Sequence, residues 1–333
     1  MRIWLNHWFS TAYYFIDMLK EDGYYIIASN ERDTCVYKMN ANEFYLEPKF
    51  NKETYLDYCL KFCKEHNIDV FFVKRGMDII IKNIKKFEDL NIKVICEQDY
   101  EKYSMLQNKY ETMNYFKQKN FINIPEMKIV TNVSEFENVY NEMINKYPKL
   151  CIKYNQDEGG MSYKLISERK PNIDRITENN GLVYSFNYVK SCLETVKDFK
   201  PLIIMPYLEG SEISIDCLGL KDKLLAIPRY KLNNRVTKID MDEELIHIAN
   251  IFYKDLKLDG PFNIQFRYSN NILYLLEINT RLSGGSWKEK YIGVNFPNLC
   301  VKKFLGDLDE LPKINTKTLE LSNLENVIEL RRY

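Results

Sequence analysis

The most informative polar residues of this 333-residue chain lie in two apolar stretches, residues 260–268 and 272–279, which read as neighbouring β-strands. Side chains alternate between the two faces of a strand, so Gln265 lies on the face opposite the apolar side chains of the first stretch. In the second stretch, Glu277 and Asn279 are two residues apart and share a face. One carboxylate and two amides offer oxygen ligands to a hard divalent ion and leave positions for water and phosphate, which suits Mg²⁺.

The length of the connecting turn decides whether these oxygens converge. A three-residue turn over residues 269–271 places Gln265 diagonally across from Glu277 on one face, and a two-residue turn places them on opposite faces. The alternative to a metal site is a hairpin face exposed to water.

Glycine is scarce, with 12 in 333 residues, so the positions where it occurs are informative. Four of the twelve form two doublets, Gly159-Gly160 and Gly284-Gly285. We expect each doublet to mark a close backbone approach to a ligand or a tight turn. A plain surface turn is the alternative for either one.

Apolar runs alternate with helical patterns over the first hundred residues, which predicts a parallel sheet with right-handed crossovers. The predicted strands cover residues 2–5, 24–28, 70–73 and 93–96, and the predicted helices cover residues 12–20, 53–65 and 78–90. The first strand-to-helix turn, residues 6–11, contains no glycine, so the phosphate-binding fingerprint of dinucleotide folds is absent. This absence argues against a nicotinamide or flavin oxidoreductase.

Beyond residue 100 the pattern changes to a helical segment, residues 100–119, followed by strands and hairpins. The predicted strands are 127–130, 150–153, 163–167, 201–206, 212–218, 223–229, 260–268 and 272–279, and the predicted helices are 134–146 and 242–256.

Residues 277–285, Glu-Ile-Asn-Thr-Arg-Leu-Ser-Gly-Gly, resemble the signature of the ATP-grasp superfamily, in which Glu-x-Asn-Pro-Arg closes the metal site. The resemblance covers nearly the whole chain in order. It implies that Gln265, Glu277 and Asn279 hold Mg²⁺ or Mn²⁺ between nucleotide phosphates, as in the carbamoyl-phosphate-synthetase-like branch. It also implies that Arg281 meets the transferred phosphoryl group.

The upstream motifs of the same resemblance supply a nucleotide site. Lys153 matches the strand lysine that contacts nucleotide phosphate, and Lys109 matches the second phosphate-binding lysine. Gly159 and Gly160 look like part of the glycine-rich lid whose backbone N–H groups cradle phosphates.

Residues 205–212 have the spacing of the linker between the two grasping subdomains, so the Tyr207 backbone would reach adenine and Glu212 would accept the ribose hydroxyls. Arg229 resembles the basic residue that faces the phosphoryl group or acyl phosphate, and the implied catalytic residues are therefore Arg229, Arg281 and Lys153.

The sequence departs from the family pattern at three positions. Tyr154 and Thr280 replace prolines, and Met205 stands where an acidic residue is common. None of these changes removes a charged group that the chemistry needs.

The fold that the resemblance implies is α/β and α+β. A Rossmann-like, parallel-sheet pre-ATP-grasp domain at residues 1–100 would precede a two-subdomain ATP-grasp fold, with the linker helix and lid subdomain at 101–205 and the metal-binding subdomain at 206–333. The implied activity is an ADP-forming ligase that joins a carboxylate to an amine or similar nucleophile through an acyl phosphate. A phosphotransferase or carboxylating enzyme on the same scaffold, or a catalytically silent ATP-binding module, stays open.

Charged residues that follow the first strands predict where the substrate binds. Arg32 follows the second predicted strand, and Lys74 and Arg75 follow the third. Ligands gather at the carboxyl ends of parallel strands, so these cations favour an anionic substrate, with Arg75 as the residue to test. The alternative is that they are ordinary solvated loop charges.

The composition limits the classes of molecule that this protein is expected to bind. Lys plus Arg and Asp plus Glu both total 47, so the chain lacks the basic excess of nucleic-acid binders. No apolar run approaches the ~18–20 residues of a membrane span, and the first residues lack the apolar stretch of a signal peptide. We therefore expect a cytoplasmic protein with small-molecule substrates and no nucleic-acid or membrane partner, and a homodimer is one assembly left open. The eight scattered cysteines read as reduced core residues.

Overall fold

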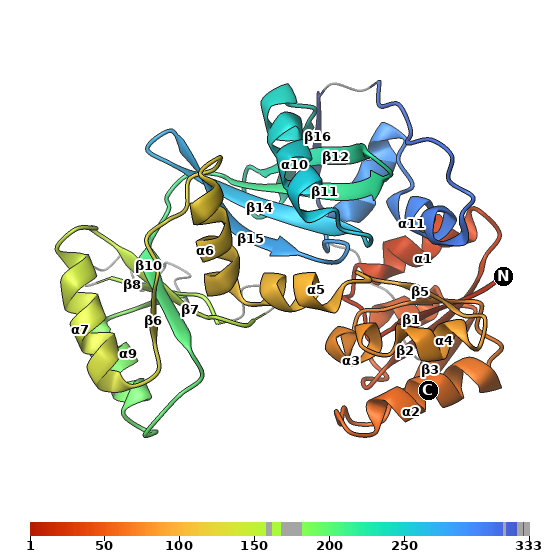
Figure 1. Ribbon diagram of the computed structural model, residues 1–333, viewed down its shortest axis with the longest axis horizontal. Coiled ribbons are helices and arrows are strands. Elements are labelled where there is room, and N and C mark those ends of the chain that lie inside the picture. Colours follow the sequence, from red (N-terminus) through yellow and green to blue (C-terminus); the bar gives the residue numbers. More distant parts are fainter. Residues whose placement is uncertain (158–161, 168–181, 316–317, 325–328, 330–333) are drawn as a thin grey trace. The chain divides into compact units, whose positions relative to one another are not determined.

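The computed structural model describes residues 1–157, 162–167, 182–315, 318–324 and 329 (Figure 1). The chain divides into two compact units. Unit 1 consists of Met1–Ser104, Glu212–Gln265 and Ile278–Tyr333, and unit 2 consists of Met105–Ser211 and Phe266–Glu277. Each unit combines segments that are separate in the sequence, whereas the three predicted domains are continuous ranges. The domain ranges therefore stay a prediction.

Unit 1 begins with a five-stranded sheet in the order β3-β2-β1-β4-β5. Every pairing in it is parallel, which confirms the predicted parallel sheet. Its strands are β1 (Arg2–Asn6), β2 (Tyr25–Asn30), β3 (Glu43–Leu46), β4 (Val70–Phe72) and β5 (Lys93–Ile95). The connecting helices are α1 (Ala12–Lys20), η1 (Val36–Met39), α2 (Tyr55–Glu65), α3 (Met77–Ile81) and α4 (Ile84–Glu88), and α5 (Tyr100–Gln107) follows.

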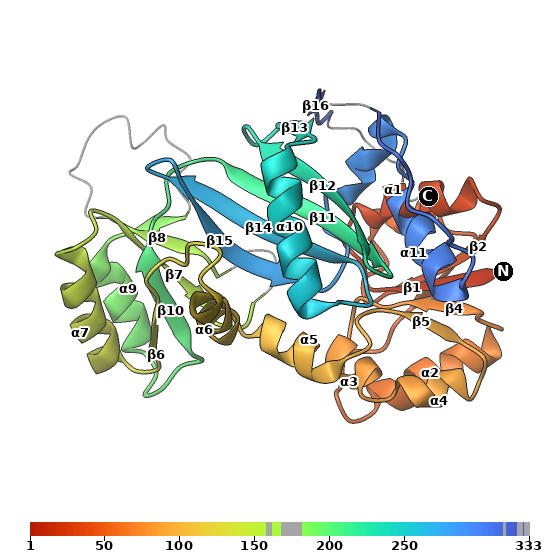
Figure 2. The same ribbon diagram turned by 45° about the horizontal axis from the view of Figure 1, so that its top comes forward.

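Alternating side chains of β1 bury both faces of this sheet. Ile3 and Leu5 belong to one apolar cluster with residues of α1 and of α11 (Phe296–Leu305). Trp4 points to the other face and packs with Phe62 of α2, with ring centroids 4.4 Å apart. Figure 2 shows α1 and α11 on one side of the sheet and α2 and α4 on the other. Such two-sided burial explains why these strands are almost continuously apolar.

Two features of this region differ from the sequence prediction. The edge strand β3 lies in a stretch where no strand is predicted, and its residues are only partly buried, so its apolar pattern is weak. The helix predicted over residues 78–90 is divided into α3 and α4 at Lys82 and Asn83. The Asn83 side chain donates a hydrogen bond to the Ile79 carbonyl, which competes with continuation of the helix.

Unit 2 contains a second five-stranded sheet in the order β6-β10-β7-β8-β9. Its elements are α6 (Lys109–Lys119), β6 (Lys128–Val130), α7 (Val133–Ile144), β7 (Leu150–Tyr154), β8 (Lys164–Ile166), β9 (Val183–Tyr184), α9 (Phe186–Leu193) and β10 (Leu202–Pro206). Helices α7 and α9 lie side by side on one face of it (Figure 1), where the rings of Phe136 and Phe186 stack. Asn132 and Ser185 cap these helices by accepting backbone N–H groups of their first turns.

A third sheet has the order β15-β14-β11-β12-β13-β16. Its strands are β11 (Glu212–Leu220), β12 (Lys223–Lys231), β13 (Val236–Asp240), β14 (Phe262–Ser269), β15 (Ile272–Asn279) and β16 (Thr318–Ser322), and the helices of this part are α10 (Glu243–Leu256), η2 (Ser286–Ile292) and α11. Asp242 caps α10 by accepting the N–H groups of Glu244 and Leu245. The bounds of β11, β12, β14, β15 and α10 agree with the predicted ranges to within about two residues. No prediction covers β13, β16 or α11.

No helix in the described ranges combines the length and apolar character that crossing a membrane requires. All eight cysteines are free thiols, as predicted. Cys192 is exposed and Cys35 is partly buried, so only the other six are core residues.

Candidate functional site

The predicted phosphate lysines and one predicted metal ligand come together in unit 2. Helix α6 begins at Lys109, and the Lys109 backbone N–H donates to the Asn155 carbonyl just beyond β7. The buried Lys109 Nζ donates to the Asp157 carbonyl at 2.7 Å and lies 3.7 Å from Glu277 Oε2. We call Lys109, Lys153 and Glu277 the lysine cluster.

Lys153 supplies the second positive charge of this cluster. It lies on β7 opposite Ile203 of β10, so the sheet fixes its backbone. Loss of surrounding water lowers the pKa of its ammonium group, the Glu277 carboxylate opposes that shift, and the like charge of Lys109 adds to it. Two lysines therefore share the Glu277 carboxylate, with the Asp157 carboxylate as a weaker influence on Lys153, and this concentration of positive charge suits a phosphate ligand.

The predicted metal ligands lie on the hairpin of β14 and β15, and the turn of this hairpin has two residues instead of three. Only Asn270 and Asn271 separate β14 from β15, and both have positive φ, as a two-residue type I′ turn requires. The two buried residues of β15, Leu275 and Ile278, are three residues apart, so the alternation along this strand is not regular and the turn length alone does not fix the faces of Gln265 and Glu277. Gln265 stays a predicted metal ligand on the resemblance alone, whereas Glu277 and Asn279 share a face of β15.

The donor set offers one carboxylate and amide oxygens. Within the described ranges, no three His, Cys, Asp or Glu side chains gather as a metal site. The residues present suit a hard ion that takes its other ligands from water and phosphate, and they do not form a closed protein cage.

Arg229 of unit 1 belongs to a second, more enclosed cluster. Its Nε donates to Asp216 Oδ2 at 2.7 Å, its Nη2 donates to the same oxygen, and Nη2 also donates to Ser283 Oγ at 2.6 Å. Glu289 Oε1 lies 3.7 Å from Arg229 Nε. We call Asp216, Arg229, Ser283 and Glu289 the arginine cluster.

Burial sets the protonation of the arginine cluster. Glu289 is fully buried, and neither of its oxygens accepts a hydrogen bond from the part of the chain that the structure describes. Burial, together with the neighbouring Asp216 carboxylate, raises the pKa of Glu289 well above its usual value. Asp216 accepts two hydrogen bonds from Arg229 and is the carboxylate that balances its charge. Arg229 thus holds Ser283, in the segment after β15, and its predicted contact with a phosphoryl group stays a prediction.

Gly285, in the second glycine doublet, leaves space for the Arg229 guanidinium. A Cβ atom on Gly285 would lie 2.3 Å from Arg229 Nη1, so any side chain there would displace the guanidinium. The backbone at Gly285 does make a close approach, but to the Arg229 side chain of the same unit. Gly159 and Gly160, the predicted lid glycines, lie outside the described residues.

Arg281, the predicted phosphoryl contact, follows β15 directly. Its guanidinium donates to the Leu282 carbonyl at 3.2 Å and to Asn279 Oδ1 at 3.5 Å, and its Cζ lies 4.9 Å from the ring centroid of Phe9. Arg281 and Asn279 are thus neighbours, as the predicted motif requires.

The predicted adenine and ribose contacts lie at the ends of β10 and β11. The Tyr207 backbone N–H donates to the Lys149 carbonyl, so a backbone contact of Tyr207 with adenine would use its carbonyl oxygen. Glu212 is the first residue of β11 and is opposite Lys231.

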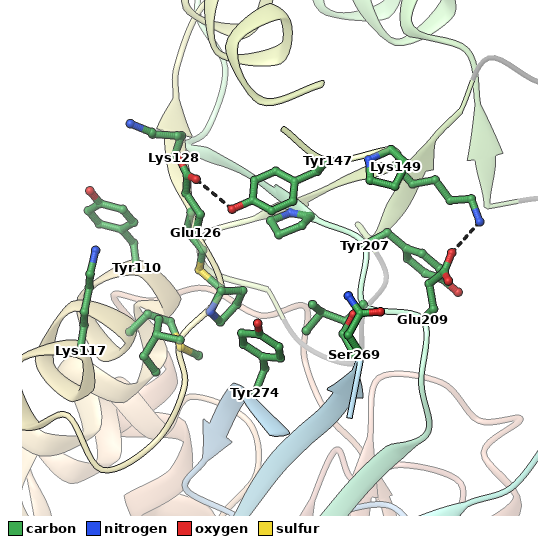
Figure 3. Close-up of a pocket in the computed structure, with 18 of the residues that line it drawn as sticks. Tyr110, Lys117, Glu126, Lys128, Tyr147, Lys149, Tyr207, Glu209, Ser269 and Tyr274 are labelled. Carbon is green, nitrogen blue, oxygen red and sulfur yellow. Dashed lines mark hydrogen bonds and ion pairs between the residues drawn. The ribbon is translucent and has the colours of Figure 1, made fainter. Parts of the chain in front are cut away.

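A cavity of about 650 Å³ lies in unit 2 beside Tyr207 (Figure 3). Its wall includes Tyr110, Tyr147 and Tyr274, with Glu126 accepting a hydrogen bond from Tyr147. None of its lining residues belongs to the lysine cluster, so the cavity does not mark the phosphate site.

The cations that follow the strands of the first sheet are engaged differently from the prediction. Arg75 lies 2.6 Å from Glu31 and 3.4 Å from the buried Glu47, and its Nη2 is 2.7 Å from His7 Nε2. Burial, and then the positive charge of Arg75, lower the pKa of His7 to about 4. Two carboxylates already balance Arg75, so it is not a cation that awaits a substrate anion.

Comparisons with known sequences support one family. A family model described as "ATP-grasp in the biosynthetic pathway with Ter operon" matches residues 198–327. The carbamoyl phosphate synthase large chain of Pseudothermotoga lettingae is 22% identical over 300 residues, which cover 86% of this chain and 26% of that protein. The corresponding protein of Saccharolobus solfataricus is 30% identical over 146 residues, 37% of this chain and 13% of its own length. The chain thus spans about a quarter or less of these curated relatives.

Solved structures share the fold. Biotin carboxylase of Campylobacter jejuni superposes with a TM-score of 0.68 at 16% identity, covering 94% of this chain and 72% of its own. N5-carboxyaminoimidazole synthetase of Staphylococcus aureus gives a TM-score of 0.67 at 15% identity, covering 97% and 82%. The L-amino acid ligase of Bacillus licheniformis gives 0.65 at 14%, covering 92% and 76%.

This chain has the ATP-grasp fold. The ATP-grasp fold confirms the predicted class, α/β and α+β with a parallel sheet ahead of the grasp region. The individual site residues stay predictions, because similarity at these identities shows the fold alone.

Sequence reasoning gave no role to three members of the arginine cluster, Asp216, Ser283 and Glu289. Asp216 had a usable signal, since Ser214 and Asp216 alternate with the apolar Ile213, Ile215 and Cys217 inside a strand. Glu289 had none, because its neighbours Lys288 and Lys290 make the segment resemble a solvated surface.

Proposed function

We propose that this protein is an ATP- and Mg²⁺-dependent ligase that activates a substrate carboxylate as an acyl phosphate and joins it to an amine or similar nucleophile. The lysine cluster is the observation that carries the proposal. Lys109 of α6 lies 3.7 Å from the Glu277 carboxylate, and the same carboxylate acts electrostatically on Lys153 of β7. Together with the family match, this charge pattern suits the phosphates of a nucleotide and its metal.

In this proposal Lys109 and Lys153 neutralise phosphate oxygens of ATP. Their backbones are held by the start of α6 and by the β7–β10 pairing, so little reorganisation is needed as charge moves during transfer. Glu212 would accept the ribose hydroxyls, and the backbone near Tyr207 would contact adenine. Gly159 and Gly160 would add backbone donors.

Glu277 and Asn279 would hold Mg²⁺ or Mn²⁺, with Gln265 as the third candidate ligand. The metal would neutralise phosphate charge and orient the phosphates for in-line attack. The carboxylate and amide oxygens of this set match the ligand preference of either ion.

The chemical step needs no protein nucleophile. A carboxylate oxygen of the substrate attacks the γ-phosphorus, the bond to the β–γ bridging oxygen breaks, and ADP leaves. The amine nitrogen then attacks the acyl carbon, inorganic phosphate departs and the nitrogen loses a proton. Arg281 would stabilise the transferred group, and the Arg229–Ser283 contact would hold the segment that follows Arg281.

The test is ADP release measured with libraries of carboxylates and amines, singly and in pairs. A ligase releases ADP at full rate only with both a carboxylate and a nucleophile. Full release with one substrate would identify a phosphotransferase, bicarbonate dependence would identify a carboxylating enzyme, and no release despite ATP binding would identify a silent module. Each of these three outcomes contradicts the proposal.

A further inference from the structure

Lys288 is a buried lysine of unit 1 that has no carboxylate partner in the described ranges. It lies on η2 and is only 7% exposed, and its Nζ donates to Thr237 Oγ1 at 2.7 Å. A protonated lysine has three N–H donors, and the part of the chain that the structure describes supplies an acceptor for only one of them. Burial of an ammonium group without a counter-ion is unfavourable, so a bound anion would stabilise this position.

Two further polar side chains lie beside this ammonium group. Lys231 of β12 and Thr237 of β13 are directly opposite each other in the antiparallel pairing, so their side chains share a face of the sheet. The Thr237 hydroxyl accepts from Lys288 and still has its own hydrogen to donate. Lys231 is exposed, so the set can be reached by a ligand from its side. We call Lys231, Thr237 and Lys288 the β13 site.

The neighbouring carboxyl groups do not neutralise Lys288. The two carboxyl groups of the arginine cluster lie beside Arg229. Glu212 is opposite Lys231 on β11, which is the side of β12 away from β13. Among the charged groups that the structure describes, those that act on Lys288 are Arg229 and Lys231, and both are cations. The β13 site therefore favours a negatively charged ligand.

The β13 site is separate from the predicted metal ligands. The third sheet has the order β15-β14-β11-β12-β13-β16, and β11 and β12 lie between β14 and β13 (Figure 2). Gln265 lies on β14 and Asn279 on β15, whereas Thr237 lies on β13. At about 4.8 Å between neighbouring strands, β13 and β14 are roughly 14 Å apart along the sheet. An anion at the β13 site is therefore not a ligand of the predicted metal.

We infer that the β13 site binds a carboxylate or phosphate group of a small molecule. Lys288 donates hydrogen bonds to this oxyanion from the buried side, the Thr237 hydroxyl donates a further one, and Lys231 adds positive charge at the exposed side. Binding at this site needs unit 1 only and does not require ligase activity. In the proposed ligase, the bound group belongs to a substrate and is remote from the reacting atoms, and this last step rests on the proposed function.

The experiment measures stabilisation of the protein by inorganic phosphate and by glutarate. The shift in Tm is followed against the concentration of each anion, with chloride keeping the ionic strength constant, and gives a Kd. Lys288→Met should raise the Kd about ten- to hundredfold, the usual effect of losing a charged hydrogen bond. Stabilisation by only one of the two anions identifies which group the site takes, and stabilisation by neither overturns the inference.

Two control variants locate the bound anion. Lys223→Met removes an exposed lysine from the other end of β12 and should leave both Kd values unchanged. Lys153→Met removes a cation of the lysine cluster and should also leave the Lys288-dependent shift in place. A shift that Lys153→Met abolishes and Lys288→Met retains would assign the anion to the lysine cluster and overturn the inference.

Thr237→Val tests the hydroxyl donor without removing a charge. It keeps the shape of the side chain and should raise both Kd values several-fold. It also provides the test, together with Lys288→Gln, if Lys288→Met fails to fold. Unchanged Kd values in Thr237→Val and in the Lys288 variant that folds would contradict the β13 site.

The pH dependence of anion binding separates a ligand-binding Lys288 from a purely structural one. Burial, and then the like charges of Arg229 and Lys231, lower the pKa of Lys288 to about 8. Sulfate keeps its charge in this range, so its Kd for the wild type should rise about tenfold between pH 7 and 9.5, as Lys288 loses its proton. The Kd for Lys288→Met should change little. The same pH dependence in both proteins would contradict a contact between Lys288 and the anion.

These measurements also separate the β13 site from the proposed function. They contain neither ATP nor a second substrate, so they give a result whether or not any substrate is turned over. Absence of ADP release with every pair of substrates contradicts the ligase, but a shift in Tm that Lys288→Met removes still supports the β13 site. ADP release that requires both substrates, without a Lys288-dependent shift, supports the ligase and overturns the site.

Discussion

The lysine cluster and the arginine cluster both combine basic side chains with carboxyl groups, but they pair their cations differently. In the lysine cluster, two ammonium groups share the Glu277 carboxylate, the Asp157 carboxylate acts on Lys153 more weakly, and loss of water lowers the pKa of Lys153. In the arginine cluster, one guanidinium donates hydrogen bonds to Asp216 and lies 3.7 Å from Glu289, whose pKa burial raises well above its usual value. Excess charge suits a site that binds a ligand, whereas balanced charge suits a support for the backbone.

The largest expected effect tests the balanced cluster. Asp216→Ala leaves the Arg229 guanidinium buried without its carboxylate, so the free energy of unfolding should fall by about 3–5 kcal/mol. Denaturant titration of the two proteins measures this difference. The control Asp222→Ala removes an exposed carboxylate in the turn between β11 and β12 and should change stability by less than about 0.5 kcal/mol. Equal losses would show that Asp216 does not balance a buried charge.

The second prediction tests the excess charge. Lys153→Met should lower turnover by about 10²–10³-fold, because removal of one preorganised charge from a phosphoryl-transfer site has that effect. Initial rates of ADP release measure it, and unfolding in denaturant should show little loss of stability. Lys197→Met removes an exposed lysine of the same unit and should leave turnover unchanged. A similar loss in both variants would indicate general damage to unit 2.

The third prediction is a pH dependence near the arginine cluster. Burial, and then the like charges of Arg229 and Lys231, lower the pKa of Lys288 to about 8, and its Nζ donates to Thr237 Oγ1 at 2.7 Å. Between pH 8 and about 10.5 the unfolded chain therefore binds more protons than the folded protein, so this group makes stability rise with pH. The gain over that window is at most about 3 kcal/mol.

Comparison with Lys288→Met isolates this contribution. Unfolding is measured at several pH values between 7 and 10.5, at the high-pH end only briefly, and the two curves are subtracted. The wild type should gain stability relative to the variant as the pH rises. A difference that stays constant, or that falls, would contradict the burial of a charged Lys288.

The smallest expected effect concerns the glycine doublet. Gly285→Ala places a Cβ atom against the Arg229 guanidinium and should cost about 1–3 kcal/mol of stability, as overpacking usually does. Gly284→Ala meets only an ordinary contact at 3.6 Å and should cost less. Thermal unfolding of the two variants makes the comparison, and equal costs would show that Gly285 is not needed to admit Arg229.

The sequence predicts elements best where a helix or strand has a strong apolar period. The helix over residues 12–20 and the strand over residues 272–279 have the predicted bounds. Helices α9 and α11 carried no prediction, although Ser185 and Asn295 are N-cap residues and a proline follows Asn295 in the first turn of α11. Strands β3 and β16 lie at sheet edges, where one side is exposed and the apolar signal is weak.

The candidate site was predictable as far as local motifs reach. The motif over residues 277–281 placed Glu277, Asn279 and Arg281 on one short segment, and their mutual distances follow from the backbone. Long-range charge balance was not predictable. Nothing local distinguishes Arg75, which two carboxylates neutralise, from Lys74, which lies on an aromatic ring. Partner choice of this kind depends on residues that are distant in sequence.

Titration of ATP into the protein by calorimetry, with and without Mg²⁺, tests the central claim most directly. The account predicts that Mg²⁺ tightens ATP binding to the wild type by roughly tenfold or more, since Glu277 binds the ion that neutralises the phosphates. In Glu277→Ala the two titrations should give the same Kd, and the unfolding curve should match that of the wild type. An unchanged Mg²⁺ dependence in Glu277→Ala, or no ATP binding to the wild type, would contradict the assignment of the lysine cluster as the nucleotide and metal site.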